Sequence, residues 1–320
     1  MAVYTEVSDE ELVAFVGEYD IGEVLTCKGI AEGVENSNYL LGTTSGTFIL
    51  TLFERRVRRD DLPFFLGLME HVAGKGFPSP TPLRGRDGNA LRQLCARPAA
   101  IVTFLEGMWP RRIRPEHCAG VGDALAHFHV AAADFGTRRR NALSVNDWRP
   151  LLESCADRAD DVNPGLADEL WRELDHIETH WPASLPGGII HADPFPDNVF
   201  FRAEKVSGMI DFYFACDDVL AFDLAICLNA WCFEGHKTFN VTKARRLLDA
   251  YRKVRELTPD EVNSLVVLAR GAAMRFLLTR LYDWLNTPPE AMVTRKDPLE
   301  FIEKLRFHQR LKGPGEYGLD

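Results

Sequence analysis

The stretch "GGIIHADPFPDNVFF", from Gly187 to Phe201, places one histidine, two aspartates and one asparagine between two apolar runs that favour β strands. A tight hairpin would need only a short polar turn here. Thirteen residues after Asn198, a further apolar run ends at Asp211 in "GMIDFYF", and the polar segment "RAEKVSG" before it predicts a hairpin turn. Both turns would gather oxygen-bearing side chains, so the pattern predicts a chemical site.

The spacing of these polar residues indicates phosphoryl transfer. That reaction needs a carboxylate to orient the attacking hydroxyl and accept its proton, and oxygen ligands for magnesium. Asp193 fits the first role, and Asn198 and Asp211 fit the second; H-x-D-x-x-x-x-N followed by a strand-borne Asp-Phe is the arrangement of kinase-type loops. An Asx turn before Pro194 would explain Asp193 alone but not the other two. For His191 we expect a supporting role, anchoring the loop by hydrogen bonds.

The rest of the chain predicts an α+β fold with two lobes. A β-rich N-terminal nucleotide-binding lobe is expected over residues 1–105, with a five-stranded antiparallel sheet and a helix against it. An α-rich C-terminal catalytic and substrate lobe is expected over residues 106–320, where the periodicity is helical almost throughout. The predicted strands cover 24–30, 36–43, 46–54, 90–96 and 99–107, and the first helices cover 9–18 and 60–77.

A second candidate site joins the first two predicted strands, in "KGIAEGVENSNYLL". Gly29 and Gly33 would allow the backbone to approach phosphates closely, and Asn36, Ser37 and Asn38 add polar groups where the next strand begins. A glycine-containing hairpin is common on its own. Together with the acidic constellation downstream, it predicts a nucleotide-phosphate loop.

Composition narrows the class of protein. The chain has 320 residues, 46% of them hydrophobic, which suits one large core or two moderate ones. A formal net charge of −10 argues against nucleic-acid binding. The start has no signal-peptide pattern and no 18 apolar residues run uninterrupted, so we expect a cytoplasmic protein that does not enter a membrane. The basic stretch "ERRVRRDD", 54–61, is expected to be a solvated loop face.

Several long stretches resemble the aminoglycoside phosphotransferase and choline kinase superfamily, and within it the homoserine kinases of the kinase-like type. The stretches are "GIAEGVENSNYLL", "FILTLFERR", "GGIIHADPFPDNVFF", "MIDFYFACDDVLAFDLAICLNAWCF" and "AMRFLLTRLYDW". The resemblance implies a protein-kinase-like fold and ATP- and Mg²⁺-dependent phosphorylation of the hydroxyl of L-homoserine, on the route to threonine. It also implies that Asp193 is the catalytic aspartate and that Asn198 and Asp211 are the magnesium ligands. The segment "IVTFLEG" would be the inter-lobe hinge, with the backbone from Val102 through Phe104 to Leu105 meeting the adenine edge.

One position departs from this family's pattern. The third strand of kinase-like folds usually carries a lysine or arginine that holds the ATP phosphates, yet Thr51 stands in the middle of "FILTLFERR". Strand alternation puts Thr51, Phe53 and Arg55 on one face, so Arg55 is a candidate for the missing cation, with Lys28 as another. A solvated arginine is the competing interpretation of Arg55.

Substrate selection follows from the charges of homoserine, which is a small amino-acid zwitterion. Its site should offer an arginine for the carboxylate and an acid for the ammonium group. Asp217 and Asp218 follow the predicted strand that ends at Asp211, and Arg275 and Arg280 lie on one predicted helix. Ion pairs with acids of neighbouring helices are the competing interpretation of the two arginines.

Alternative functions differ in class. A kinase of another small alcohol, such as an aminoglycoside, choline or methylthioribose, would keep the same fold; an aminoglycoside site should be crowded with acids, whereas the C-terminal third mixes Arg and Asp. A non-catalytic nucleotide-binding homologue has support only from Thr51. A metal-dependent hydrolase built on His191, Asp193 and Asp211 would lack the further ligands that two-metal sites use.

Overall fold

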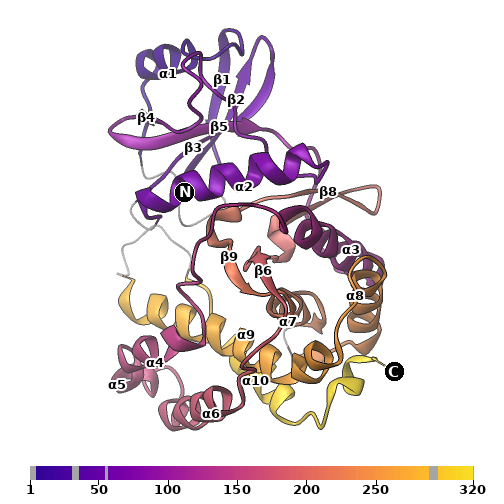
Figure 1. The fold of residues 1–320 in the computed structure, drawn as a ribbon. Coiled ribbons are helices and arrows are strands. Elements are labelled where there is room, and N and C mark those ends of the chain that lie inside the picture. The colour runs from indigo at the N-terminus through magenta and orange to yellow at the C-terminus, as the bar shows by residue number, and fades with distance from the viewer. Residues whose placement is uncertain (1–4, 31–35, 55–56, 236, 288–294, 320) are drawn as a thin grey trace. The chain divides into compact units, whose positions relative to one another are not determined.

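The computed structural model describes residues 5–30, 36–54, 57–235, 237–287 and 295–319. The chain forms two compact units (Figure 1). Unit 1 contains residues 1–107 together with 207–213, and unit 2 contains residues 108–206 and 214–320. An antiparallel five-stranded sheet combined with helices confirms the predicted α+β class. The prediction used a single boundary, between residues 105 and 106. It therefore did not include residues 207–213 in the N-terminal part, whereas in the structure they belong to unit 1.

Unit 1 is built on an antiparallel sheet with strand order β1-β2-β3-β5-β4. Residues of β2 alternate between buried and half-buried, which is the pattern of a strand with one face in a core. The strand predicted over 99–107 ends earlier, at Thr103. The elements are α1 (Asp9–Val16), β1 (Val24–Gly29), β2 (Ser37–Thr43), β3 (Gly46–Leu52), the 3₁₀ turn η1 (Arg59–Asp61), α2 (Leu62–Gly74), β4 (Arg92–Leu94) and β5 (Arg97–Thr103).

The two faces of this sheet bury different sets of side chains. Leu50 and Leu52 of β3 join a core cluster with apolar residues of α1. Phe53, which follows β3, packs edge-on against Tyr213, with ring centroids 5.3 Å apart, and Phe65 of α2 contacts the same ring at 5.7 Å. The segment 207–213 therefore supplies an aromatic ring to the core of unit 1.

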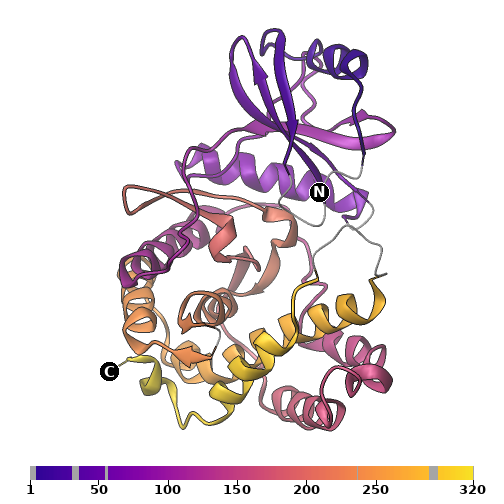
Figure 2. The same cartoon turned by 180° about the vertical axis from the view of Figure 1, so that it is seen from behind.

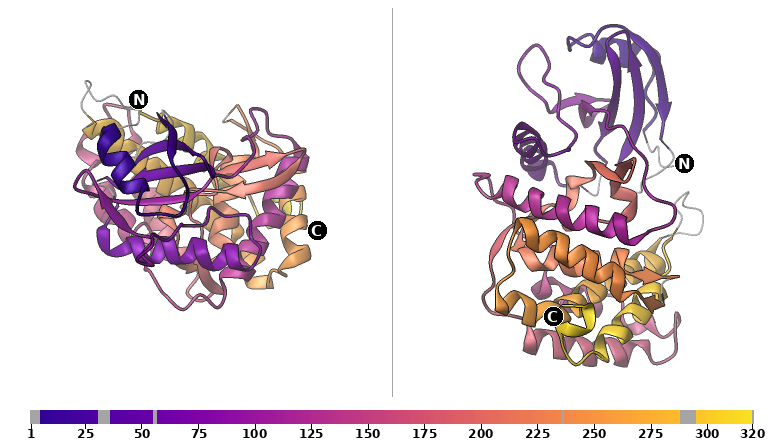
Figure 3. Two further views of the ribbon diagram at one scale, coloured as in Figure 1. Left: turned by 90° about the horizontal axis from the view of Figure 1, so that it is seen from above. Right: turned by 90° about the vertical axis from the view of Figure 1, so that its right-hand side faces the viewer.

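Unit 2 consists mainly of helices. Figure 2 shows α9 and α10, in gold and yellow, and Figure 3 shows α3 and α8 side by side. By length and composition α9 could cross a membrane, but 56% of its apolar window is buried in the protein and it packs against α7 and α10, so its apolar surface belongs to a core. The helices are α3 (Pro115–Ala132), α4 (Val145–Glu153), α5 (Ala156–Ala159), α6 (Leu166–His180), α7 (Leu220–Trp231), α8 (Val241–Val254), α9 (Pro259–Asn286) and α10 (Leu299–Gln309).

Short strands carry the loops of interest. β6 (Gly187–Ile190) pairs antiparallel with β9 (Cys216–Val219) and leads directly into His191. Ala203 and Glu204, both with positive φ, connect β7 to β8 as a tight hairpin turn does. The remaining elements are η2 (Pro196–Asn198), β7 (Val199–Arg202), β8 (Lys205–Met209), η3 (Phe212–Phe214), β10 (Phe233–Glu234), β11 (Thr238–Phe239) and η4 (Pro314–Tyr317).

Candidate active site

The loop that follows β6 is held in a strained conformation. Ala192 has φ 63°, in the left-handed region that an alanine seldom adopts. The carboxylate of Asp223, fully buried in α7, accepts the amide hydrogens of His191 at 2.7 Å and Ala192 at 2.8 Å. Arg275 of α9 donates to the carbonyl oxygen of Ala192. The peptide units preceding Asp193 are therefore fixed on their donor side and their acceptor side, which stabilises the strained backbone.

Asp193 lies at the centre of this loop. Burial of its carboxyl raises the pKa to about 6, an effect that the positive charge of Arg275 partly opposes. The Asn198 side chain donates from Nδ2 to the carbonyl oxygen and to Oδ2 of Asp193, both at 2.9 Å. The amide of Asp193 donates to His191 Nδ1 at 3.3 Å. A carboxylate with such a pKa can accept a proton near neutral pH.

The two predicted magnesium ligands are at defined backbone positions. Because the amide nitrogen of Asn198 faces Asp193, its oxygen points the other way, and Oδ1 accepts no hydrogen bond from the described residues. Asp211 follows β8 in unit 1 with φ 64°. A left-handed aspartate costs backbone energy and is common at functional positions. An amide oxygen and a carboxylate are ligands that magnesium accepts, so both residues fit this ion.

The predicted nucleotide loop is described in part. Gly29 ends β1, whereas Gly33 lies outside the described residues. The side chains of the three polar residues bind within unit 1: Asn36 Oδ1 accepts the amide of Glu54 at 3.2 Å, Ser37 Oγ donates to Glu54 at 2.8 Å, and Asn38 Oδ1 accepts the hydroxyl of Thr51 at 2.8 Å. These contacts fix where β2 begins relative to β3.

Thr51, at the position usually held by a cation, is buried in unit 1 with 2% of its surface exposed. Its hydroxyl donates to Asn38 Oδ1, and burial raises the pKa of Tyr213 in the same unit. Two neutral hydroxyl groups thus occupy this part of unit 1. Arg55 lies outside the described residues, and Lys28 is exposed on β1.

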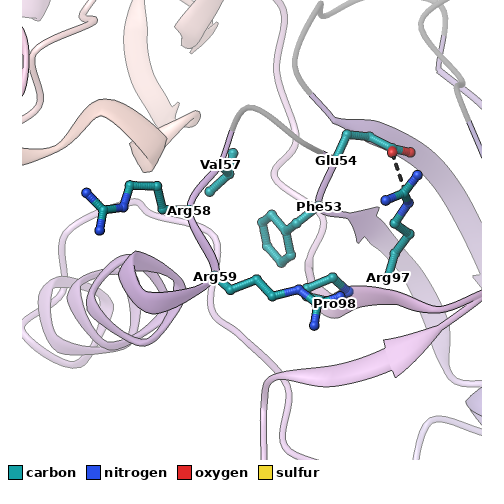
Figure 4. A pocket seen from close by; sticks show the side chains of 7 residues that line it. All are labelled: Phe53, Glu54, Val57, Arg58, Arg59, Arg97 and Pro98. Atoms are coloured by element: carbon teal, nitrogen blue, oxygen red, sulfur yellow. Dashed lines mark ion pairs between the residues drawn. The ribbon is translucent and has the colours of Figure 1, made fainter.

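A pocket of about 310 Å³ lies at the end of β3 (Figure 4). Three arginines contribute to it, and the pair Glu54–Arg97 at 3.2 Å closes one side. Arg58 and Arg59 belong to the basic stretch that was expected to be a solvated face, and both are exposed. The lining residues are Phe53, Glu54, Val57, Arg58, Arg59, Arg97 and Pro98.

The predicted hinge begins at the end of β5. Val102 is buried and pairs with Ile49 of β3, and it also bridges to Pro82. Phe104 follows the strand and is 41% exposed. In the same unit, Ser207 Oγ donates to the carbonyl oxygen of Glu106 at 2.7 Å. The residue after the strand thus presents an aromatic surface on unit 1.

The profile of the phosphotransferase enzyme family matches residues 26–257. The chain belongs to this phosphotransferase family. It is 63% identical to a homoserine kinase of Paramagnetospirillum magneticum, over all of both chains, and 63% identical to a homoserine kinase of Rhodospirillum rubrum, over all of this chain and 99% of the other. A solved amicoumacin kinase in complex with AMP-PNP and Ca²⁺ matches with a TM-score of 0.71 at 12% identity, over 97% of this chain and 93% of the other. These findings confirm the predicted family and its kinase-like fold.

The predicted substrate residues of this phosphotransferase are held by contacts within unit 2. Asp217 accepts from Arg138 Nη1 at 2.7 Å and from the amide of Arg139 at 2.9 Å. Asp218 accepts from Asn141 Nδ2 at 2.6 Å, and burial raises its pKa. These partners come from the loop between α3 and α4.

The two predicted arginines differ in their surroundings. Arg280 pairs with Glu300 at 2.7 Å and lies over the Phe301 ring, so its contacts match the competing ion-pair interpretation. Arg275 is 2% exposed, lies over the Phe276 ring, and its Nε has no acceptor among the described residues. Arg275 therefore retains an unused donor in the same unit as Asp193.

Sequence reasoning missed two groups of partners in this phosphotransferase. Asp223 was not among the predicted site residues, but its carboxylate accepts hydrogen bonds from the amides of His191 and Ala192. The arginine run at 138–140 received no role, although Arg138 and Arg139 contact Asp217. The run itself is visible in the sequence, whereas the pairing of Asp223 with a loop 31 residues away requires the fold.

Proposed function

We propose that this phosphotransferase transfers the γ-phosphoryl group of ATP to the hydroxyl of L-homoserine, giving O-phospho-L-homoserine. The observation that carries the proposal is 63% identity over the full length of both chains to a protein named homoserine kinase. The solved structures are too distant to indicate a substrate, and they support the fold alone. The reaction would be a step of threonine biosynthesis in the cytoplasm.

Asp193 orients the hydroxyl in an in-line transfer and accepts its proton. Its raised pKa suits a group that must be ionised at neutral pH and still bind a proton as the transition state forms. One hydrogen bond from Asn198 holds Oδ2 of the carboxylate, so Oδ1 can face the substrate. His191 supports the loop through the amide of Asp193.

Magnesium would be held by Asn198 and Asp211, the first through its amide oxygen and the second through its carboxylate. The ion would neutralise phosphate charge during the transfer. The orientation of the Asn198 amide, with the nitrogen on Asp193 and the oxygen available, supports this assignment.

ATP would bind to unit 1 through two backbone segments. The loop from Gly29 to Asn38 would contact the phosphates, and the segment from Val102 to Phe104 would meet the adenine edge. Arg55 stays the proposed phosphate cation, and Arg58 and Arg59 place further positive charge at the end of the same strand.

For the zwitterionic acceptor, Asp217 and Asp218 are proposed for the ammonium group and Arg275 and Arg280 for the carboxylate. Arg275 has the stronger support, because one of its donors is unused while Arg280 is paired with Glu300. Binding at Arg280 would have to replace that ion pair.

A coupled ATP-turnover assay with magnesium tests the proposal, using L-homoserine, L-serine, choline, methylthioribose and an aminoglycoside, with the product identified by phosphorus NMR. Selective turnover of homoserine is expected. Asp193→Asn is the matched control and should lower turnover by about 10³-fold or more while nucleotide affinity, measured by calorimetry, stays nearly unchanged. Turnover of another alcohol would replace the substrate assignment. ATP binding without turnover of any alcohol would favour a non-catalytic homologue.

A further inference from the structure

A row of buried hydrogen bonds leads away from the catalytic loop through unit 2. It begins at Asp223, whose Oδ2 lies 3.1 Å from Nε2 of His129 in α3. His129 Nδ1 lies 2.7 Å from the hydroxyl of Tyr251 in α8. Both residues are buried, and α3 and α8 run side by side (Figure 3). The row therefore joins the loop before Asp193 to the α3–α8 packing.

The far end of the row determines the direction of its hydrogen bonds. Arg255 can only donate, and it does so from Nη1 to the Tyr251 oxygen at 3.2 Å and from Nη2 to the fully buried Glu261 at 2.8 Å. The Tyr251 oxygen accepts from Arg255, and the acceptor within reach of its own hydrogen among the described residues is Nδ1 of a neutral His129, 2.7 Å away. A neutral His129 then carries its hydrogen on Nε2 and donates it to Asp223.

Each donor in the row thus finds an acceptor, and the last acceptor is the carboxylate that fixes the catalytic loop. Asp223 receives three hydrogens, two from the amides of His191 and Ala192 and one from His129. Loss of the third would leave Oδ2 of that buried carboxylate with one partner fewer, so that only the two loop amides would hold its orientation. The left-handed Ala192 would then lose part of the constraint that holds it.

We propose that His129 and Tyr251 are positioning residues for phosphoryl transfer: through Asp223 they fix the backbone that orients Asp193. The inference rests on the proposed function for its kinetic readout. A small displacement of a reacting carboxylate lowers turnover strongly. The row belongs to unit 2, whereas the segments proposed to bind ATP belong to unit 1. Substitutions that break this row of hydrogen bonds should therefore lower kcat and leave the KM for ATP unchanged.

The chain contains a matched pair of residues that serves as a control. Tyr317 and His308 form the same kind of buried contact, with the hydroxyl 2.8 Å from Nδ1, but His308 continues to Asn229 at 3.3 Å instead of to Asp223. Asn229 in turn donates to the carbonyl oxygen of Ala269 in α9. Removing either tyrosine hydroxyl deletes one buried hydrogen bond to a histidine in unit 2, yet only one of the two leads to the catalytic loop.

The test compares Tyr251→Phe with Tyr317→Phe. Both should lower the melting temperature, Tyr251→Phe by somewhat more, because it also removes the acceptor of Arg255 Nη1. Tyr251→Phe alone should lower kcat, by about tenfold, and should leave the KM for ATP unchanged. This factor is the low end of the loss seen when a residue that orients a metal-binding side chain is removed. It should also speed hydrogen exchange at the amides of His191 and Ala192. His129→Gln, which keeps an N–H donor, should retain more activity than His129→Met, which keeps the bulk without the donor.

Two results would overturn the proposal. The first is a kcat within twofold of the wild type for both Tyr251→Phe and His129→Met, with the exchange of the two loop amides unchanged. The second is an equal loss of kcat in Tyr251→Phe and Tyr317→Phe, since the effect would then follow stability. If the wild-type protein phosphorylated none of the alcohols, the proposed function would fail, and amide exchange in the variants would still test the positioning role.

Discussion

The packing of α3 on α8 predicts that Gly122→Ala destabilises the protein, although alanine favours helices. A Cβ at Gly122 would overlap the carbonyl oxygen of Leu247 in α8 and lie 2.9 Å from its carbonyl carbon and 3.2 Å from its Cα. These are backbone atoms, which cannot rotate away as the end of a side chain can. Helix α8 would have to move away from α3 to admit one methyl group.

The size of the effect follows from these distances. Carbon atoms pack best at 3.5–4.0 Å, so a separation of 2.9 Å requires a shift of about 1 Å. Overpacking of this kind costs about 1–3 kcal/mol, and the upper part of that range applies because backbone must move. Replacing a mid-helix glycine by alanine returns about 1 kcal/mol. The net loss of about 1–2 kcal/mol should lower the melting temperature by about 2–8 °C for a domain of this size.

Thermal unfolding followed by circular dichroism measures this loss, and Gly120→Ala is the matched control in the same helix. A Cβ at Gly120 would meet only the ends of Phe201 and Val206, at 3.2 and 3.4 Å, and these side chains can give way. That variant should unfold within about 2 °C of the wild type, because the small overlap and the gain in helix propensity nearly cancel. If Gly122→Ala were as stable as Gly120→Ala, the close approach of α8 to α3 would be wrong.

Activity should follow the ionisation of Asp193: burial raises its pKa to about 6, so kcat/KM should fall tenfold per pH unit below about pH 6, and a pH–rate profile that breaks near about pH 4 would contradict this. Burial lowers the pKa of His308 from 6.5 to about 3. Between pH 6.5 and pH 3 the histidine is therefore protonated in the unfolded chain but not in the folded protein, so the free energy of unfolding decreases as the pH falls. The loss should be about 2 kcal/mol between pH 7 and pH 5, and denaturant titrations of wild type and His308→Gln should show a smaller loss in the variant. Thr51→Lys, which restores the cation usual at this position, should destabilise unit 1 by more than about 2 kcal/mol, because the site is 2% exposed; a stable variant with stronger ATP binding would refute this.

Local patterns predicted much of the fold. The alternation in residues 36–43 and the turn before Gly46 correspond to β2 and β3, and the helical period of 60–77 corresponds to α2 at Leu62–Gly74. Such signals depend on neighbours in sequence, so a single chain carries them. The strand predicted over 99–107 ends at Thr103, because an apolar run does not reveal where pairing with a neighbouring strand stops.

The loop that contains Asp193 and Asn198 was singled out by its motif, but the distant residues that bind it were not. Asp193 and Asn198 are five residues apart, and their contact at 2.9 Å follows from local turn geometry. Asp223 and Arg275 act on the same loop from 31 and 83 residues away. Periodicity predicts that each lies on a helix, but it does not predict which backbone group each side chain meets. Those contacts depend on how α7 and α9 pack, which is decided by the whole core.

Thr51 shows why a role cannot be assigned from strand position alone. The register pairs Thr51 with Asn38 and with Ala100, and the Thr51 hydroxyl donates to Asn38 Oδ1. A lysine there would need a counter-charge, whereas the Thr51 hydroxyl finds a neutral acceptor in Asn38. The substitution is therefore consistent with its local surroundings. Arg58 and Arg59 line the pocket at the end of β3 and are exposed, as the sequence predicted for this basic stretch.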